Sequence, residues 1–309
     1  MIEIENVDKK EKMKRIVIHH HDPDGLTSAS LIPHALGFGN TWIFISQDPN
    51  EEFPVLQADE VYIVDVAITE KTWGSIGNIQ CAHIVWIDHH RPFTELSSLA
   101  VPQNVKILLD PTSPSAVLLV QKYFSLNDEI SRKIVELGTK ADTWQLDPFV
   151  ESWMALDMAY SIKKRDKTHL IKALATGKLE ITGHLKRTLN SYLHKKEEAK
   201  EKLLKNTVIQ DIHGHLVAIG LAPSFISGSE GAGIISQKTN SEVQIVLKYQ
   251  GWMSFRRAKN SNINLLTLAN IFGGGGHEYA SGATFSKHVT SRNFQRIAEE
   301  IFSKIAEVL

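Results

Sequence analysis

Three apolar segments near the start of the chain each end in acidic or histidine residues. They are RIVIHHHDPDG from Arg15 to Gly25, VYIVDVA from Val61 to Ala67, and VWIDHH from Val85 to His90. Short apolar runs of this length predict buried strands. Because the carboxyl ends of neighbouring strands in an open parallel sheet converge on one crevice, the side chains that follow these strands are expected to lie together. Those side chains are Asp22, Asp24, Asp65, Asp88 and the neighbouring histidines.

A close cluster of carboxylates is repulsive unless a cation neutralises it. Aspartate and histidine together offer oxygen and imidazole ligands, a mixture that suits Mn²⁺ or Zn²⁺ better than an all-oxygen Mg²⁺ or Ca²⁺ site. Each segment alone has an ordinary alternative, since consecutive histidines occur on surfaces and Asp-Pro-Asp-Gly forms turns. The repetition of acids at three strand ends favours a metal centre.

Composition limits the class of protein. With 309 residues, 42% hydrophobic and 22% charged, the chain has the make-up of a soluble globular protein of two domains. A net charge of −1 argues against coating of long nucleic acid by overall charge, so a polyanionic ligand must be met by local basic groups. A single cysteine is typical of a reducing compartment. With no signal-like segment and no run of about 18 apolar residues, we expect a cytoplasmic protein without membrane contact.

The spacing of apolar residues predicts an α/β protein. Further strands are expected at Thr41–Ser46 and Val105–Asp110, and their alternation with helices indicates βαβ units and a parallel sheet. Helical spacing dominates from residue 115 onwards, and residues 185–206 mix both charge signs as a solvated connecting helix does. Strands return at residues 215–222 and 252–258. The expected parts are 1–184, a helix over 185–206, and a smaller α/β part over 207–309, interrupted by GSEGAG (228–233) and GGGGHEYASGA (273–283).

Several of these segments, taken in order, resemble the motifs of a known family. HHHDPDGLTSAS, IVDVA, WIDHH and GTKADTW resemble the four motifs of the DHH phosphoesterases, and SFRRA with GGGGHEYASGA resembles their DHH-associated C-terminal domain. The family includes RecJ-type single-strand exonucleases, NrnA-type oligoribonucleases (nano-RNases and pAp phosphatases) and cyclic-dinucleotide phosphodiesterases. The resemblance implies that residues 1–184 are a catalytic domain with a parallel sheet, and that residues 207–309 bind substrate.

The resemblance also implies a set of metal ligands. Two manganese ions are expected, with Mg²⁺ or Co²⁺ as substitutes, and Asp65 is expected to bridge them. The other ligands would be His20 and Asp22 on one ion, and Asp24, His89 and Asp142 on the other. His20 is preferred over His19 and His21 by strand alternation and spacing, and the choice among the three stays open.

Two further residues are expected to take part in catalysis. The resemblance places His90 against the scissile phosphate, where it can donate a hydrogen bond to developing charge or protonate the leaving oxygen. Asp88 is expected to orient a neighbouring imidazole. The ordinary alternative for His90 is packing under the edge of the sheet.

The C-terminal glycine run is expected to bind phosphate. EYASGA can open a helix, so backbone N–H groups of the glycines before it would form an anion-binding nest at a helix start. The resemblance supports this assignment and adds two basic side chains, so that the expected contacts are Arg256, Gly273, Gly274, Gly275, Gly276 and His277. Trp144 and Phe255 are aromatic residues that either stack a base or belong to the core.

The function expected is hydrolysis of short single-stranded RNA or DNA oligonucleotides to 5′-mononucleotides. Two divalent ions lower the pKa of a bound water and clamp both oxygens of an in-line phosphoryl displacement. The alternatives are a RecJ-like single-strand exonuclease, a cyclic-dinucleotide or pAp phosphoesterase, and a non-catalytic nucleotide-binding accessory protein. Polarity of attack is open, and so is a homodimeric state.

Overall fold

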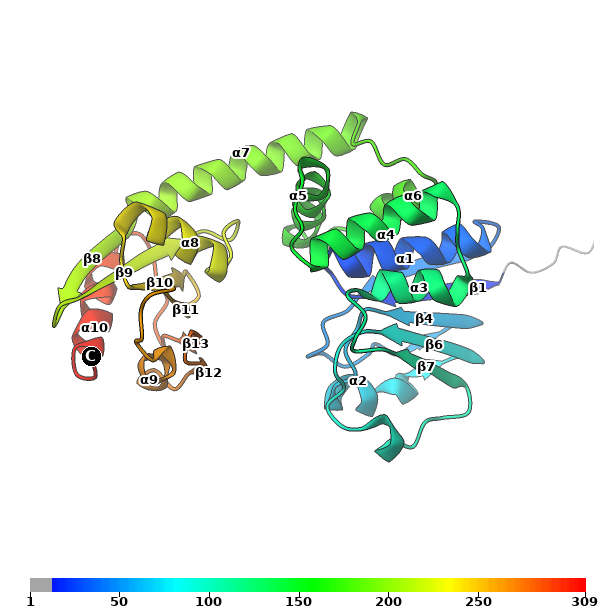
Figure 1. Cartoon of the computed structure of the whole chain (residues 1–309), viewed down its shortest axis with the longest axis horizontal. Coiled ribbons are helices and arrows are strands. Elements are labelled where there is room, and N and C mark those ends of the chain that lie inside the picture. The colour runs from blue at the N-terminus through cyan, green and yellow to red at the C-terminus, as the bar shows by residue number, and fades with distance from the viewer. Residues whose placement is uncertain (1–12) are drawn as a thin grey trace, which may run out of the picture. The chain divides into compact units, whose positions relative to one another are not determined.

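The structure is a computed structural model that describes residues 13–309 (Figure 1). The chain divides into two compact units, of which the first ends at Leu189 and the second comprises Asn190–Leu309. The boundary lies within the long helix α7 (Gly183–Lys205). Among the described residues, no helix combines the length and the apolar character needed to cross a membrane.

The first unit is built on a five-stranded parallel sheet with the strand order β2-β1-β4-β6-β7. The strands are β1 (Lys14–His19), β2 (Thr41–Ser46), β4 (Glu60–Val64), β6 (His83–Asp88) and β7 (Val105–Leu109). A small sheet pairs β3 (Leu56–Gln57) with β5 (Ile79–Gln80). The helices are α1 (Pro23–Leu36), α2 (Glu70–Gly74), α3 (Ala116–Phe124), α4 (Glu129–Asp142), α5 (Pro148–Ile162) and α6 (Thr168–Ala175), with short 3-10 turns at Ile76–Asn78 and Leu96–Ser98.

Both faces of this sheet are covered, which explains why its strands are continuous apolar runs. Val17 and Val64 face the core that α1, α3 and α4 form, and Ile16 and Trp86 belong to the core on the α2 side (Figure 1). Parallel strands need long crossovers, and every crossover returns the chain to the same edge. The residues after β1, β4 and β6 therefore meet at one edge of the sheet.

The second unit contains a six-stranded mixed sheet with the strand order β12-β13-β11-β10-β9-β8, in which only β9 and β10 run parallel. The strands are β8 (Thr207–Ile212), β9 (His215–Ala222), β10 (Val243–Lys248), β11 (Trp252–Arg257), β12 (Gly275–His277) and β13 (Ala280–Thr284). The helices are α8 (Gly228–Thr239), α9 (Leu265–Asn270) and α10 (Phe294–Ile305). The predicted α/β fold class is confirmed.

The two glycine-rich segments of the second unit take different structures, and the local prediction for one of them is wrong. The segment GSEGAG is the first part of α8, because Ser227 caps that helix by accepting a hydrogen bond from the N–H of Glu230. EYASGA does not open a helix: residues 275–284 form the hairpin β12–β13. The hydrogen bonds offered by β11 favour the strand.

Candidate metal centre

Asp65 lies at the middle of the site, immediately after β4. Its backbone has φ 56°, a left-handed conformation that is uncommon outside glycine, and its N–H donates to the carbonyl of Ile87 at 3.0 Å. The side chain is 1% exposed, and its Oδ2 has no hydrogen-bond partner among the described residues. A buried carboxylate oxygen without a partner is costly, so this position is suited to a ligand that binds it.

One set of candidate ligands joins Asp65 to the end of β1. The ligand atoms of His20, Asp22 and Asp65 lie within 4.8 Å of one another. His20 Nδ1 is 2.8 Å from Asp22 Oδ2 and 3.8 Å from Asp65 Oδ2. Asp22 also caps α1, because its Oδ1 accepts from the N–H of Gly25 at 2.9 Å. A Cβ at Gly25 would overlap the carbonyl of His20, so this tight turn requires the glycine.

A second set lies on the other side of Asp65 and consists of Asp24, His89 and Asp142, again within 4.8 Å. His89 Nε2 is 3.6 Å from Asp65 Oδ1, 3.7 Å from Asp24 Oδ2 and 3.8 Å from Asp142 Oδ2. His89 Nδ1 is 3.2 Å from the carbonyl of Ser113. A carbonyl only accepts, so Nδ1 carries the proton and Nε2 presents its lone pair to the acids, the arrangement expected of a metal-ligating histidine.

Asp24 is held in place by the start of α3. Its two carboxylate oxygens accept from the N–H groups of Ala116 at 2.6 Å and Val117 at 3.0 Å. The N-terminus of a helix stabilises negative charge. Burial nevertheless raises the pKa of Asp24 to about 7, and the charges of Asp22 and Asp142 contribute.

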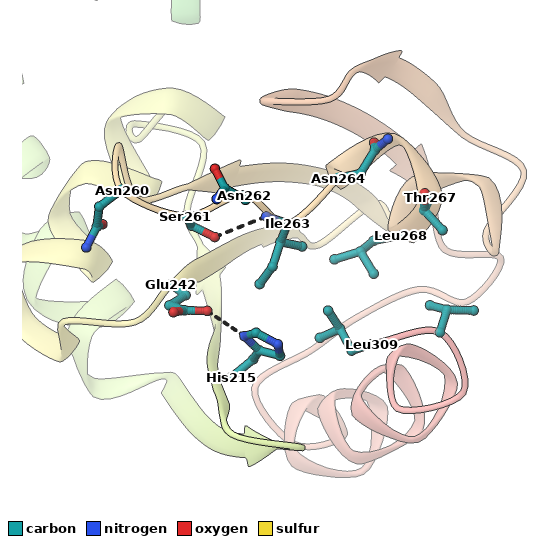
Figure 2. Close-up of a pocket in the computed structure, with 11 residues that line it drawn as sticks. His215, Glu242, Asn260, Ser261, Asn262, Ile263, Asn264, Thr267, Leu268 and Leu309 are labelled. Carbon is teal, nitrogen blue, oxygen red and sulfur yellow. Dashed lines mark hydrogen bonds and ion pairs between the residues drawn. The ribbon is translucent and has the colours of Figure 1, made fainter.

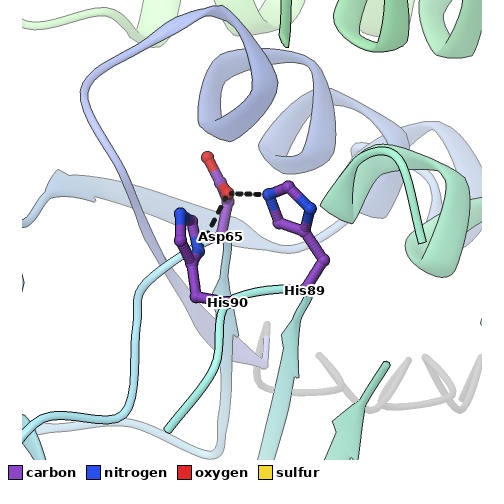
Figure 3. Close-up of side chains that lie close together, drawn as sticks. All are labelled: Asp65, His89 and His90. Atoms are coloured by element: carbon purple, nitrogen blue, oxygen red, sulfur yellow. Dashed lines mark ion pairs between the residues drawn. The ribbon is translucent and has the colours of Figure 1, made fainter. Parts of the chain in front are cut away.

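His90 follows His89 and takes a different partner. Figure 3 shows the two imidazoles on either side of the Asp65 carboxylate. His90 Nδ1 donates to Asp88 Oδ1 at 2.8 Å, and Asp88 is 1% exposed. This hydrogen bond raises the pKa of His90 and fixes its tautomer. Because the His90 side chain is 44% exposed, its Nε2 can meet a ligand from solvent.

The electrostatics of the whole cluster suit divalent ions. Burial and the neighbouring carboxylates raise the pKa of Asp65 well above its ordinary value, and burial raises that of Asp142. In the absence of a cation these acids therefore tend to hold protons. Divalent cations would relieve both the repulsion and the unpartnered oxygen of Asp65. The mixture of carboxylates and imidazoles fits manganese.

The three consecutive histidines have different surroundings. Only His20 has a ring within the described clusters of candidate ligands. His19 is 1% exposed, its Nδ1 bonds to the carbonyl of His20, and burial followed by the charge of Lys167 lowers its pKa to about 4. The carbonyl of His21 accepts hydrogen bonds from Lys167 Nζ and Ser161 Oγ, which belong to a later part of the chain.

Lys167 also forms a buried ion pair with Asp157, and sequence reasoning missed both residues. Lys167 Nζ donates to the His21 carbonyl at 2.7 Å and lies 2.6 Å from Asp157 Oδ1. Their exposures are 4% and 2%. Burial raises the pKa of Asp157 to about 6. Lys167 stands in the charged run KKRDK, which has the look of a solvated surface loop, so no local signal marks it as buried.

The residues expected to bind phosphate lie in the second unit. Arg256 and His277 are both paired with Ala280, so three adjacent strands bring them to one row of the sheet. Arg256 Nη2 donates to Ser229 Oγ at 2.8 Å, and the ring of His277 stacks on Tyr279 at 5.4 Å.

The glycines 273–276 do not precede a helix, so the expected nest at a helix start is absent from the described structure. Gly276 has φ 133°, and a Cβ at Gly274 would overlap the carbonyl of Gly282. Their use in this structure is therefore to allow a tight hairpin with close backbone contact.

The second unit also has a pocket of about 510 Å³ between β9, the segment after β11, and the C-terminal residues (Figure 2). Three asparagines, Asn260, Asn262 and Asn264, line it together with His215 and Glu242, whose side chains are 2.7 Å apart. None of the residues predicted from the sequence to bind phosphate lines this pocket.

No protein-family model matches the sequence, and the curated proteins contain no match either. Solved structures do match over nearly the whole chain. The DHH domain of a protein assigned to a family of ribosomal proteins has a TM-score of 0.60 at 18% identity, covering 96% of this chain and 87% of its own. The pGpG-specific phosphodiesterase PggH from Vibrio cholerae has a TM-score of 0.56 at 15% identity, covering 95% and 99%. The exonuclease RecJ bound to manganese has a TM-score of 0.53 at 17% identity, covering 96% and 91%.

The structural neighbours of this chain are therefore DHH-family phosphoesterases. The fold expected from the sequence, a parallel sheet followed by a smaller α/β part, is confirmed; the first sheet has five strands and the second is mixed. The chain has the DHH phosphoesterase fold with a candidate Asp/His metal site.

Proposed function

We propose that the protein is a manganese-dependent phosphodiesterase that hydrolyses short oligonucleotides to 5′-mononucleotides. The observation that carries the proposal is the division of the Asp65 carboxylate between two sets of ligands, with Oδ2 facing His20 and Oδ1 facing His89. Manganese-binding RecJ and the phosphodiesterase PggH have the same fold, which supports the assignment of the class.

In this proposal the ligands fall into two sets that share Asp65. His20 and Asp22 hold one ion, and Asp24, His89 and Asp142 hold the other. Such ions supply an activated water and stabilise the charge of a phosphoryl group in transfer. Mg²⁺ or Co²⁺ could substitute for manganese in the same positions. How well each binds depends on its preference for imidazole ligands.

Side chains of the two units are proposed to have separate tasks in binding and cleaving the substrate. Asp88 accepts the Nδ1 proton of His90, and in its doubly protonated form the ring donates its second proton from Nε2 to a phosphate oxygen or the leaving oxygen. Arg256 and His277 grip a phosphate of the nucleotide through the second unit. We also propose that residues 1–184 form the catalytic domain, 185–206 the connecting helix, and 207–309 the substrate-binding domain.

Short substrates are favoured over long ones by the net charge and by the folds of the two described units. The net charge is −1, and the chain covers 99% of the chain of a phosphodiesterase that acts on the dinucleotide pGpG. Enzymes that track long single strands commonly add an oligonucleotide-binding fold, and neither described unit has its closed barrel.

The test is a comparison of initial rates with four substrates in the presence of Mn²⁺: an RNA dinucleotide, a 20-mer, a cyclic dinucleotide and pAp. The dinucleotide should be cleaved fastest. Fastest cleavage of the 20-mer would indicate a RecJ-like exonuclease, and fastest cleavage of the cyclic dinucleotide or pAp would indicate the other phosphoesterases. No turnover in protein shown to contain manganese would indicate a non-catalytic nucleotide-binding protein.

A further inference from the structure

The helix that supplies Asp142 ends in an unusual way. After α4, the N–H of Gln145 donates to the carbonyl of Lys140 at 2.9 Å, and the N–H of Trp144 donates to the carbonyl of Ala141 at 3.4 Å. These two bonds define a Schellman motif, whose left-handed residue is most often glycine. Here that residue is Trp144, with φ 56°.

A bulky side chain at this position is unfavourable on two counts. The left-handed backbone crowds its Cβ, and the ring is 74% exposed, so the protein gains little from burying it. Other described helices whose last turn is followed by a residue of positive φ use small, polar or flexible residues there: Gly37, Ser125, Lys164, Gly177 and Asn240. Trp144 differs from all of them, and it follows the candidate metal ligand Asp142 by two residues.

The position of Trp144 is set by the motif. It follows Asp142 by two residues, a distance along the chain of at most roughly 7 Å. Asp142 Oδ2 is itself 3.8 Å from His89 Nε2. An ion pair spans the turn, because Lys140 Nζ lies 3.0 Å from Asp147 Oδ2. The backbone of Trp144 is thus fixed on a turn two residues after a candidate metal ligand, and its side chain is exposed.

We propose that the indole of Trp144 is the platform on which a nucleobase of the substrate stacks. This inference rests on the proposed function and adds the part of the substrate that is recognised. An exposed aromatic face beside a phosphate-cleaving centre suits any base, since every base has a π-face. The stacking proposal predicts that any of the bases is accepted but that a base is required. Phosphate esters without a base should therefore bind less tightly than nucleotides.

The test compares two ligands that differ only in the base. Adenosine 5′-monophosphate and ribose 5-phosphate are titrated into the full-length protein with Mn²⁺, and binding is followed by calorimetry and by tryptophan fluorescence. Adenosine 5′-monophosphate should bind about tenfold more tightly, within the range measured for stacking of one base on an aromatic ring. It should also quench fluorescence, whereas ribose 5-phosphate should not.

The decisive variant is Trp144→Gly, because glycine is favoured at this position and the fold should be at least as stable. It should bind both ligands equally, at the wild-type affinity for ribose 5-phosphate, and it should lose the quenching. Trp144→Phe should keep part of the preference. Phe38→Ala is the matched control, since Phe38 is 39% exposed and lies between α1 and β2, at the opposite end of the strands.

Two results would overturn the stacking role. One is a wild-type protein that binds the two ligands equally, and the other is a Trp144→Gly variant that keeps the preference for the base. Both results come from equilibrium binding of ligands that the protein is not expected to cleave, so they do not depend on turnover. Absence of phosphodiesterase activity would count against the proposed function while leaving the result on the base intact.

Discussion

The two oxygens of the Asp65 carboxylate face different sets of ligands. Oδ2 is 3.8 Å from His20 Nδ1, and Oδ1 is 3.6 Å from His89 Nε2. The left-handed backbone at φ 56° directs the side chain between them. The left-handed backbone and the burial of the carboxylate both reduce the stability of the fold at this position. Backbone strain of this kind is characteristic of functional sites.

At this residue we expect Asp65→Asn to abolish manganese-dependent activity. The amide carries no charge and offers one acceptor oxygen, so it cannot serve two cations. Rate and metal content should be measured on the same preparation. A variant that keeps both ions and more than about a tenth of the rate would refute the bridging role, since loss of electrostatic stabilisation commonly costs much more.

Asp24 leads to a prediction about pH. Its pKa in the folded protein is about 7 against an ordinary value of 3.8, so between these values the folded state holds a proton that the unfolded state has released. The metal-free protein should therefore lose stability as pH rises through this window. Urea titrations of wild type and Asp24→Asn at several pH values should show a steeper fall in wild type. Equal slopes would mean that Asp24 ionises normally.

At the scale of elements, the loop after β1 depends on helices far away in the sequence. Asp157 on α5 and Lys167 just before α6 form a buried pair, in which Lys167 donates to the His21 carbonyl. Substituting one partner leaves the other charge buried and alone, whereas removing both avoids that cost.

Lys167→Met should therefore lower the free energy of unfolding by about 3 to 5 kcal/mol. The double variant Lys167→Met/Asp157→Leu should recover much of the loss, as measured by denaturant titration. Lys133→Met is the control, because the Lys133–Glu129 pair is exposed and should leave stability nearly unchanged. A single variant as stable as this control would show that the pair is already solvated.

The row formed by β11, β13 and β12 should grip substrate without cleaving it. Arg256→Ala is expected to raise KM for a short oligonucleotide about tenfold or more, while His90→Ala should chiefly lower kcat. Steady-state kinetics on a dinucleotide and on bis-p-nitrophenyl phosphate separate the two effects. Equal losses on both substrates for Arg256→Ala would assign it to the cleavage site or to folding, because the small diester lacks the extra phosphate.

For the whole molecule, the proposed function predicts a preference for length. Dimers to pentamers should be cleaved faster than 20-mers, because a chain with net charge −1 offers few further phosphate contacts as the substrate grows. Initial rates at equal concentrations of ends provide the measurement. A rate that climbs steadily with length would favour a RecJ-like enzyme instead.

Much of the fold and the approach of the acids to one another could be predicted from the sequence. The apolar runs before Asp22, Asp65 and Asp88 specify buried parallel strands, and the carboxyl ends of such strands meet at one edge. This reasoning needs only the local pattern and the rule of parallel crossovers. The DHH phosphoesterase fold followed from the order of the motifs.

Tertiary structure decided what local patterns leave open. EYASGA forms a hairpin where the start of a helix was expected, because β11 offers hydrogen bonds to it, and GSEGAG begins α8, because Ser227 caps that helix. From the sequence, Trp144 and Phe255 are both aromatic residues that could stack a base or belong to the core. In the structure Trp144 is 74% exposed, whereas Phe255 is buried in the sheet at 0%. Lys167 looks like a surface residue and is enclosed with Asp157. The physical reason is shared: burial depends on residues distant along the chain, and no window of sequence contains them.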